Sequence, residues 1–434
     1  MQEKGKISFS SAVLMSINIM VGAGIMAAVG PMTGSAGSTS FLGWPVIGLL
    51  LFPVIWCMAK AAQLFPGEGG FYHYCSSAMN PFAGFVAHWG YLLGYLGTAA
   101  TLATVLRNGF VSNTGIEFFQ QYPMAFNLIL VVLYTLINLI GVEKISKIQS
   151  IATLVKITPI VMVIALLVFY FNPDLSFDLK GMGNLGMTVS TVIFAYWGFE
   201  ACCSIGGLLK GGPQKVASVI LVGFFATMAL YFFFHLGLLY IMGPENLATY
   251  GAIEFPRFLG LSPAVGSALQ VGISCAILFS WANSILGVSM ANITNIYSLA
   301  SKKLILGDKL LTTVNKSQRP VYAAVAHGVV FFAFITFVQD LDVLFSLTNL
   351  GVIIAFVLTL VAVFLTYLKQ RNYPQLAVTV LGFGSCSALI YYSALKIPSV
   401  MYVLPLVIGM TLGIIMFQIQ RARQSKLSLA LQEA

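Results

Sequence analysis

Two ionisable side chains lie inside long apolar runs of this sequence, where a charge is costly to place. Lys156 falls in the run 149–171 and Glu200 in the run 186–208. Such residues are candidates for function by default, because an ammonium or a carboxyl group there can exchange a proton or hold an opposite charge. Each also has a structural interpretation: Lys156 can extend to a membrane surface, and Glu200 can hydrogen-bond unwound backbone.

The backbone offers a second kind of chemistry. Residues 18–31, Asn-Ile-Met-Val-Gly-Ala-Gly-Ile-Met-Ala-Ala-Val-Gly-Pro, place three glycines and a proline inside the first long apolar run, and a similar break covers 194–198. Gly22 and Gly24 can adopt positive φ and let a ligand approach the backbone. An interrupted helix presents free N–H groups on one half and free carbonyls on the other, and a zwitterion fits between them. The alternative is that the glycines only allow close helix packing.

The amino-acid composition indicates the class of protein to which these groups belong. Of the 434 residues, 59% are hydrophobic and only 8% are charged, and the mean hydropathy is +0.92. Soluble globular proteins carry about 25% charged residues, so that class is excluded. We therefore predict an all-α integral membrane protein with a single transmembrane domain over residues 1–434.

Apolar runs bounded by polar or Gly/Pro clusters predict twelve membrane helices. They fall near 10–33, 42–64, 81–106, 124–141, 149–171, 186–208, 216–242, 264–300, 321–338, 343–368, 375–394 and 398–420. The eighth run exceeds one bilayer crossing, and we interpret its polar end, 292–301, as a helix that continues into the cytoplasm.

The basic residues indicate the orientation, because Lys and Arg accumulate on cytoplasmic loops. With the N-terminus inside, 18 of the 22 basic residues fall on the cytoplasmic side, counting Lys156 within its span. The outer loops keep Arg107, Lys180, Arg257 and Lys396. Both termini are therefore predicted to be cytoplasmic. Topology accounts for the net charge of +9, so no nucleic-acid partner is predicted.

Five motifs now resemble one family, the amino acid-polyamine-organocation (APC) permeases. Residues 21–26 (Val-Gly-Ala-Gly-Ile-Met) resemble its Gly-Ser-Gly-Ile-Phe signature. The segments 65–74 and 80–85 are similar to its second-to-third helix loop, 194–200 (Phe-Ala-Tyr-Trp-Gly-Phe-Glu) to its sixth helix, and 315–320 to the entry of its ninth. The motifs keep the family's order and spacing over nearly the whole chain.

The resemblance implies the LeuT-like fold with two inverted repeats of five helices. Repeat one would cover about 10–171 and repeat two about 186–368, with peripheral helices at about 375–420. Helices 1 and 6 would be the broken pair, where the glycine pattern independently indicates breaks. The sequence departs from the family after the sixth helix, where the loop 206–215 lacks an acid, and in the eighth helix, where Asn-Ile-Thr-Asn at 292–295 replaces an arginine.

The family pattern also implies a binding site. Amides around Gly22, Ala23 and Gly24 would hold a carboxylate, and carbonyls near Ile19, Phe194 and Trp197 an ammonium. The other expected substrate-binding residues are Gly198, Tyr91 on the third helix and Trp281 on the eighth. Each aromatic can instead be ordinary packing. His88 lies near Tyr91 and is the histidine most worth testing, although a hydrogen-bonded structural role is the alternative.

The same resemblance implies coupling or gating roles for Lys156 and Glu200. Lys156 matches a fifth-helix lysine whose ammonium stands where sodium-coupled relatives bind sodium, and Glu200 matches a glutamate of the arginine/agmatine antiporter. Glu200 would then accept a proton, hold a gate or face a cationic substrate.

The expected function is secondary active transport of amino acids or related amines by alternating access, coupled to protons or to exchange. A sodium-coupled symporter and a non-transporting sensor with this fold remain alternatives. No enzyme activity, catalytic residue, metal or cofactor is predicted, because the six cysteines and four histidines show no ligand spacing. The expected partners are the small-molecule substrate, protons and the lipid bilayer, and the expected location is a bacterial inner membrane. The sequence leaves the oligomeric state open.

Overall fold

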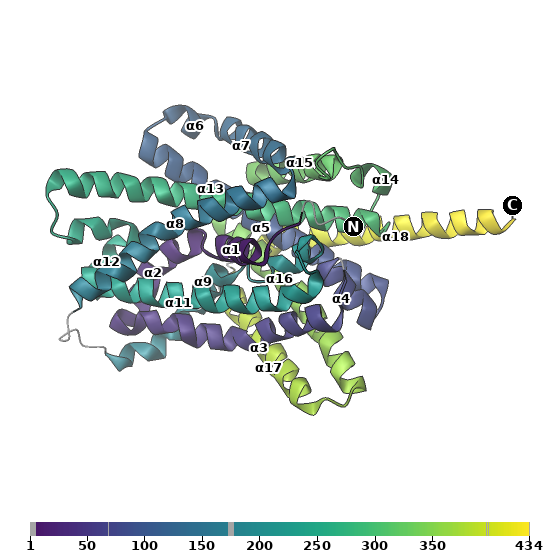
Figure 1. Cartoon of the computed structure of the whole chain (residues 1–434), viewed down its shortest axis with the longest axis horizontal. Helices are drawn as coiled ribbons and strands as arrows, with labels where there is room; N and C mark the ends of the chain where they lie inside the picture. Colours follow the sequence, from purple (N-terminus) through teal and green to yellow (C-terminus); the bar gives the residue numbers. More distant parts are fainter. Residues whose placement is uncertain (1–5, 68, 172–177, 396, 398, 434) are drawn as a thin grey trace.

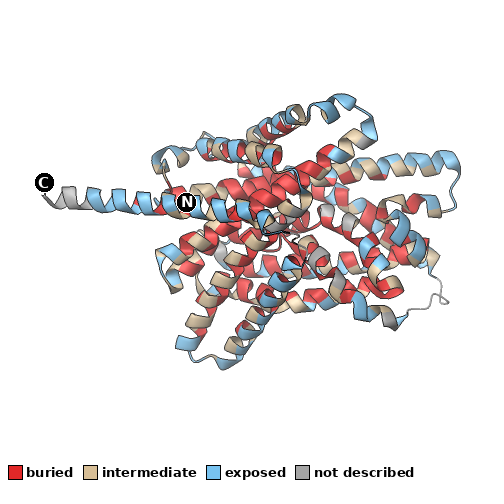
Figure 2. Ribbon diagram, turned by 180° about the vertical axis from the view of Figure 1, so that it is seen from behind, coloured by how far each residue is buried: buried red, intermediate tan, exposed pale blue. Residues whose placement is uncertain are grey.

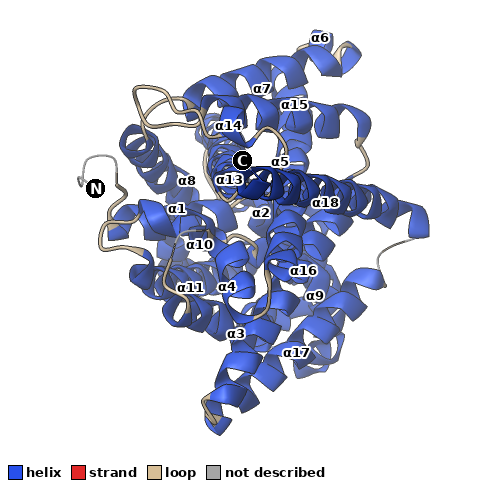
Figure 3. Ribbon diagram, turned by 90° about the vertical axis from the view of Figure 1, so that its right-hand side faces the viewer, coloured by secondary structure: helices blue, strands red, loops and turns tan. Residues whose placement is uncertain are grey.

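The computed structural model describes residues 6–67, 69–171, 178–395, 397 and 399–433. Within these ranges the chain forms α-helices joined by short 3-10 helices and loops, and no strand (Figure 3). Together with the apolar composition, this architecture confirms an all-α membrane protein. Buried residues concentrate in the centre of the bundle and exposed ones on its outer helices (Figure 2).

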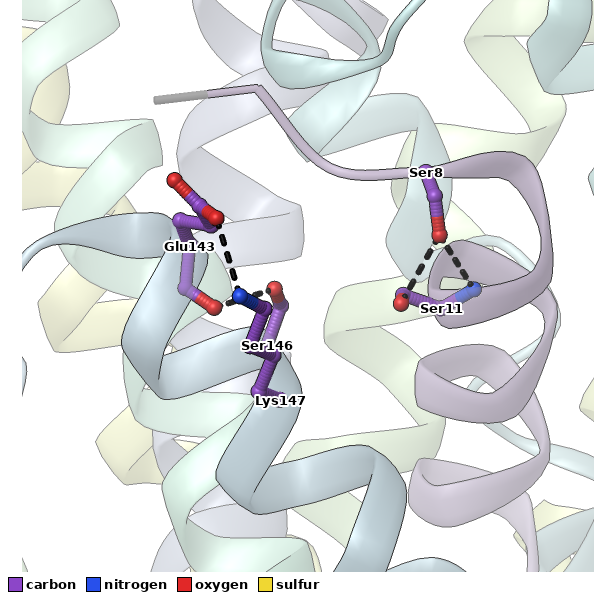
Figure 4. Close-up of polar contacts among 5 residues, drawn as sticks. All are labelled: Ser8, Ser11, Glu143, Ser146 and Lys147. Atoms are coloured by element: carbon purple, nitrogen blue, oxygen red, sulfur yellow. Dashed lines mark hydrogen bonds and ion pairs between the residues drawn. The ribbon is translucent and has the colours of Figure 1, made fainter. Parts of the chain in front are cut away.

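The first membrane helix is broken, as the glycines predict. Helix α1 covers Phe9–Met20 and α2 covers Ala23–Ala36. Ser8 is the N-cap of α1, where its hydroxyl accepts a hydrogen bond of 3.1 Å from the Ser11 N–H (Figure 4). Such a cap satisfies one of the free N–H groups of the first turn. Val21 and Gly22 separate the two half-helices.

The second predicted break is also present. Helix α9 covers Val189–Tyr196 and α10 covers Ala201–Ile205. Between them Gly198 has a φ of +122°, a conformation that residues with a Cβ rarely adopt. The glycine at this position therefore lets the helix end and restart within four residues.

The remaining helices include the other predicted long runs. They are α3 (Gly43–Leu64), α4 (Gly70–Ala78), α5 (Pro81–Thr114), α6 (Glu117–Gln121), α7 (Pro123–Asn138), α8 (Val142–Tyr170), α11 (Val216–Met242), α12 (Pro244–Tyr250), α13 (Pro263–Ser301), α14 (Asp308–Leu311), α15 (Val321–Phe337), α16 (Leu341–Lys369), α17 (Tyr373–Ala394) and α18 (Leu404–Glu433). Helix α8 begins at Val142 instead of residue 149, and four short helices match no predicted run, α4, α6, α12 and α14.

Eight helical stretches in the described part of the chain are long and apolar enough to span a membrane. One of them joins α2 to α3, and α1, α7 and α15 are shorter apolar helices. The count of twelve and the inverted-repeat division remain predictions. Helix α18 extends well past the predicted end at residue 420 and projects beyond the bundle (Figure 1).

The structure corrects the placement of Arg107. The sequence analysis assigned it to an outer loop, but α5 continues to Thr114 and Arg107 lies inside this helix, only 9% exposed. Its Nη1 donates a hydrogen bond of 3.4 Å to the Asn127 Oδ1 on α7. The polar residues after 106 end the apolar run without ending the helix, because residues such as Arg are good helix formers. Arg107 therefore joins Lys156 and Glu200 as an ionisable residue within a membrane helix.

The packing brings the two breaks to the centre of the molecule. Helix α1 packs against α8, α11 and α13, and α2 packs against α9. The long helix α5 packs against α13 and α16. In Figure 1, α1 and α5 lie centrally and α7 and α17 at opposite margins. Near the start of α8, Lys147 and Glu143 form an ion pair of 3.0 Å (Figure 4).

Candidate functional site

The two helix breaks touch each other. A Cβ placed on Gly198 would lie 2.6 Å from the Ile19 Cγ2 and 2.9 Å from the Met20 N, so only a glycine allows this approach. Helices α2 and α9 are equally close, since a Cβ on Gly24 would lie 2.7 Å from the Ala195 Cα. Close packing therefore explains Gly24 and Gly198. It does not explain Gly22, whose nearest neighbours would be 3.5 Å from an added Cβ.

The start of α2 has no side-chain cap among the described residues. Its N-cap is Gly22, with φ −105° and ψ −139°. The Val21 N–H donates to the Ile17 carbonyl and the Gly22 N–H to the Met20 carbonyl, so these two amides are used locally. The first N–H groups of α2 have no acceptor within their own helix. A carboxylate is the kind of group that such a terminus attracts.

A small pocket lies beside this terminus. Its volume is about 10 Å³, roughly the space for one water molecule. Its lining comes from the first break, α8 and α13: Val21, Gly22, Ile25, Met26, Lys156, Pro159, Ile160, Ala276, Ile277, Ser280 and Trp281. An amino acid does not fit in this volume.

Lys156 reaches into the first break from α8. Its side chain is 3% exposed, and its Nζ donates to the Asn18 carbonyl over 2.5 Å and to the Ser284 Oγ over 3.0 Å. The Ser284 hydroxyl donates to the same Asn18 carbonyl over 2.9 Å. The lysine therefore does not extend to a membrane surface. It lies at the carbonyl end of α1, which favours a positive charge.

A polar network surrounds this contact. The Asn283 Nδ2 donates to the Asn18 Oδ1 over 2.8 Å, and the Asn18 Nδ2 donates to the Asn283 carbonyl over 3.1 Å. Gln149, one turn before Thr153 on α8, is fully buried, and neither end of its amide has a partner among the described residues. The ion pairs found in the described ranges are Lys147–Glu143 and Arg257–Glu254. The groups that Lys156 contacts are thus a neutral carbonyl and a neutral hydroxyl rather than a carboxylate.

Glu200 is bound by the chain itself. It is fully buried at the second break. Its Oε2 accepts a hydrogen bond of 3.1 Å from the Gly198 N–H and its Oε1 one of 3.0 Å from the Tyr95 hydroxyl. The carboxyl group therefore ties the unwound segment to α5. Both oxygens are already engaged without any ligand.

The family assignment follows from the sequence match. The family model described as amino acid permease matches residues 7–417. This chain belongs to the amino acid permease family. The predicted membership of the APC superfamily is thereby confirmed.

Several curated relatives resemble the permease at low identity. An uncharacterised transporter of Mycobacterium tuberculosis is 24% identical over 65% of this chain, and the match spans 64% of that relative's length. The serine/threonine exchanger SteT of Bacillus subtilis is 21% identical over 85% of this chain, and the match spans 84% of the exchanger's length. A probable agmatine/putrescine antiporter of Lactococcus lactis is 24% identical over 59% of this chain and 57% of its own.

The aromatic residues predicted for the permease's site lie in different surroundings. The Trp197 Nε1 donates to the Asn349 Oδ1 on α16 over 2.5 Å, which links the second break to that helix. Tyr91 is fully buried against Tyr95, with ring centroids 4.3 Å apart, and its hydroxyl has no partner among the described residues. The Trp281 Nε1 likewise lacks a partner there. Phe194 is half-buried against the core.

His88 has a structural role in the permease. Its Nδ1 accepts a hydrogen bond from the Tyr72 N–H, and its Nε2 lies 3.2 Å from the Asn295 carbonyl. A backbone N–H can only donate, so Nδ1 is unprotonated and Nε2 carries the proton. Both ring nitrogens are thus occupied by backbone groups.

Sequence reasoning did not assign roles to several residues that the structure brings to the breaks. Tyr95 follows Tyr91 by one helical turn, and Asn18 precedes Gly22 by one turn, so helical spacing would have pointed to both. Asn349 and Tyr231 lie within the mostly apolar runs 343–368 and 216–242, where several polar or aromatic residues occur and no local pattern distinguishes these two.

Proposed function

We propose that this permease is a secondary active transporter that moves amino acids or related amines by alternating access, coupled to protons or to exchange. One observation carries the proposal most: two unwound helix segments touch each other at the centre of the bundle, beside a buried lysine. Paired interruptions of this kind are typical of transporter binding sites.

The two breaks supply both partners that a zwitterion needs. The amides of Ala23 and Gly24 would hold the α-carboxylate at the positive end of α2, next to Gly22, whose own N–H already donates to the Met20 carbonyl. Carbonyls near Ile19, Phe194 and Trp197 would hold the α-ammonium. The uncapped start of α2 supports this assignment. The pocket is too small for a substrate, so this geometry suits an occluded state between the open ones.

Lys156 supports coupling to protons or exchange rather than to sodium. Its ammonium donates hydrogen bonds to the Asn18 carbonyl and the Ser284 hydroxyl. These are two oxygens of the kind that would coordinate a sodium ion. Two cations at about 4 Å repel by about 4 kcal/mol at an effective dielectric constant near 20. A proton on Lys156 would therefore replace sodium as the charge that stabilises the carbonyl end of α1.

Glu200 supports a preference for substrates with neutral side chains. Both carboxyl oxygens accept hydrogen bonds from the chain, from Gly198 and Tyr95, which leaves little capacity for a cationic side chain. The named substrates of the serine/threonine exchanger are neutral amino acids. Because another relative is named as a probable agmatine/putrescine antiporter, cationic amines are also included in the transport test.

Contacts among segments assigned to the same side support the proposed orientation, with both termini cytoplasmic in a bacterial inner membrane. Lys302 lies over the Tyr72 ring at 5.2 Å, and the Gln424 Nε2 donates to the Lys303 carbonyl. Ile7 forms a bridge with Leu209. All of these residues come from segments assigned to the cytoplasmic side by their basic charge.

Transport by purified protein tests the proposal. The permease would be reconstituted into liposomes and offered radiolabelled L-serine, L-isoleucine, L-arginine and agmatine, each with a pH gradient, a sodium gradient or an internal load of the same compound. We expect at least one compound to enter, driven by the pH gradient or by exchange. Movement of none, together with no thermal shift by any of them, would contradict the proposal and favour a different class of protein.

A further inference from the structure

A tyrosine outside the predicted site joins the two helix breaks. Tyr231 lies on α11 and is fully buried. Its hydroxyl lies 2.7 Å from the Met20 carbonyl and 3.1 Å from the Ala195 carbonyl. Met20 is the last residue of α1, and Ala195 belongs to the last turn of α9. One hydroxyl group therefore contacts both interrupted helices.

The breaks create the need for this donor. In a continuous helix the Ala195 carbonyl would accept a hydrogen bond from the N–H of residue 199, and the Met20 carbonyl from that of residue 24. The interruptions remove both bonds, and in membrane interiors an unsatisfied carbonyl is costly. The Gly22 N–H also donates to the Met20 carbonyl, over 2.7 Å. The Tyr231 hydroxyl hydrogen is shared between the two carbonyls.

Neighbouring rings hold the phenol of Tyr231 in place. The Trp44 ring lies 4.7 Å away and the Tyr196 ring 5.8 Å away. The Trp44 indole N–H donates to the His235 Nδ1 over 3.1 Å, and the His235 Nε2 lies 2.9 Å from the Thr33 Oγ1. An indole N–H only donates, so the His235 proton is on Nε2. The support for Tyr231 thus extends from α11 to α3 and α2.

We propose that Tyr231 is a positioning residue of the substrate site, which ties the end of α1 to the end of α9. The inference rests on the proposed function, because carbonyls near these two helix ends are the ones assigned to the α-ammonium of a zwitterion. A hydroxyl shared by both carbonyls fixes the separation of the half-helices before any substrate arrives. Preorganised groups lose less free energy on binding, so the tie raises substrate affinity.

Tyr196 provides a matched control. It is fully buried in the same aromatic cluster, and its hydroxyl donates a hydrogen bond of 2.9 Å to the Trp44 carbonyl. Tyr196→Phe and Tyr231→Phe each remove one hydroxyl and keep the ring. Only Tyr231→Phe removes a donor from the breaks, so a difference between the variants reports on the tie rather than on packing.

Hydrogen exchange of the backbone tests the tie without needing a substrate. Exchange would be followed by mass spectrometry in peptides covering 17–25 and 193–200, in wild-type protein and in both variants. We expect Tyr231→Phe to speed exchange in both peptides by about threefold or more, which corresponds to the loss of one buried hydrogen bond. Tyr196→Phe should leave the 17–25 peptide unchanged. Unaltered exchange in Tyr231→Phe, an increase at one break only, or an equal effect of Tyr196→Phe would overturn the inference.

Binding measurements then test the consequence for the site. Equilibrium binding of L-serine, L-isoleucine and agmatine should weaken about three- to tenfold in Tyr231→Phe and less than about twofold in Tyr196→Phe. Equal affinities in the two variants would overturn the positioning role. If wild-type protein binds none of the three compounds while exchange responds as expected, the proposed function fails and the tie between the breaks stands.

Discussion

The Nζ of Lys156 donates a hydrogen bond to the carbonyl oxygen of Asn18, 2.5 Å away, across the interface between α8 and α1. The carbonyl is free for this bond because α1 ends two residues later, at Met20. A side chain on one helix thus completes the hydrogen bonding of another helix that is interrupted at membrane depth. Any change in the charge of Lys156 alters how the carbonyl end of α1 is stabilised.

Substitutions at the first break should separate packing from binding. Gly24→Ala is expected to destabilise the fold by about 1 to 3 kcal/mol, because the new Cβ would overlap the Ala195 backbone. Gly22→Ala is expected to fold, since its Cβ has contacts no closer than 3.5 Å, and to weaken substrate binding. Thermal unfolding and L-serine binding measure the two effects. A stable Gly24→Ala or a Gly22→Ala with unaltered affinity would contradict this division.

The structure also changes one expectation from the sequence. The glycine pattern predicted that Gly24, like Gly22, lets a ligand approach the backbone, so that a bulky side chain there would block binding. The close contact with Ala195 indicates that such a variant loses helix packing first. Gly22 is therefore the better position for testing the carboxylate site.

Glu200→Gln should act on stability rather than on substrate choice. A neutral amide keeps one oxygen and replaces the other by an NH₂ group, so it can no longer accept hydrogen bonds from both the Gly198 N–H and the Tyr95 hydroxyl. We expect a loss of about 1 to 3 kcal/mol in the free energy of unfolding. Affinities for L-serine and L-arginine should fall by similar factors. A loss confined to L-arginine and agmatine would show that Glu200 faces a cationic substrate. Tyr95→Phe, which removes the other hydrogen bond, is the matched comparison.

The contact between Trp197 and Asn349 should contribute a measurable coupling energy. The indole N–H and the amide oxygen are 2.5 Å apart, and both residues are buried. A double-mutant cycle with Trp197→Phe and Asn349→Ala should give about 0.5 to 1.5 kcal/mol in unfolding experiments. Strict additivity of the two single changes would show that the hydrogen bond contributes nothing to the link between the second break and α16.

His73 should make stability depend on pH. It lies on α4, where burial and the Lys302 ammonium lower its pKa below the usual 6.5. The unfolded chain then binds more protons than the folded one as the pH falls through 6.5, so this contribution to stability is complete above 6.5 and declines below it. His73→Gln should lose less stability than wild type between pH 7 and pH 5. Superimposable profiles of unfolding temperature against pH would contradict the assignment.

The fold was largely predictable because its signals are local. The apolar run 216–242 matches α11 residue for residue, and the glycines mark both breaks. The site was predictable in part. Spacing and resemblance pointed to Lys156 and Glu200, but their partners come from distant segments: Ser284 lies 128 residues from Lys156, and Tyr95 lies 105 residues from Glu200. Tyr231 could not be predicted, because it lies in an apolar run, where an aromatic residue usually only packs against its neighbours.

The central claim concerns the proton on Lys156, and proton movement tests it most directly. Liposomes containing the permease and a trapped pH-sensitive dye would be given the best substrate of the uptake panel, with wild-type protein, Lys156→Met and the control Lys144→Met, whose side chain is exposed at the start of α8. The account predicts that substrate entry changes the internal pH for wild type and Lys144→Met. Lys156→Met should lose this change and the uphill accumulation while substrate exchange persists. Sodium-dependent uptake that ignores pH, or unaltered proton movement in Lys156→Met, would contradict the account.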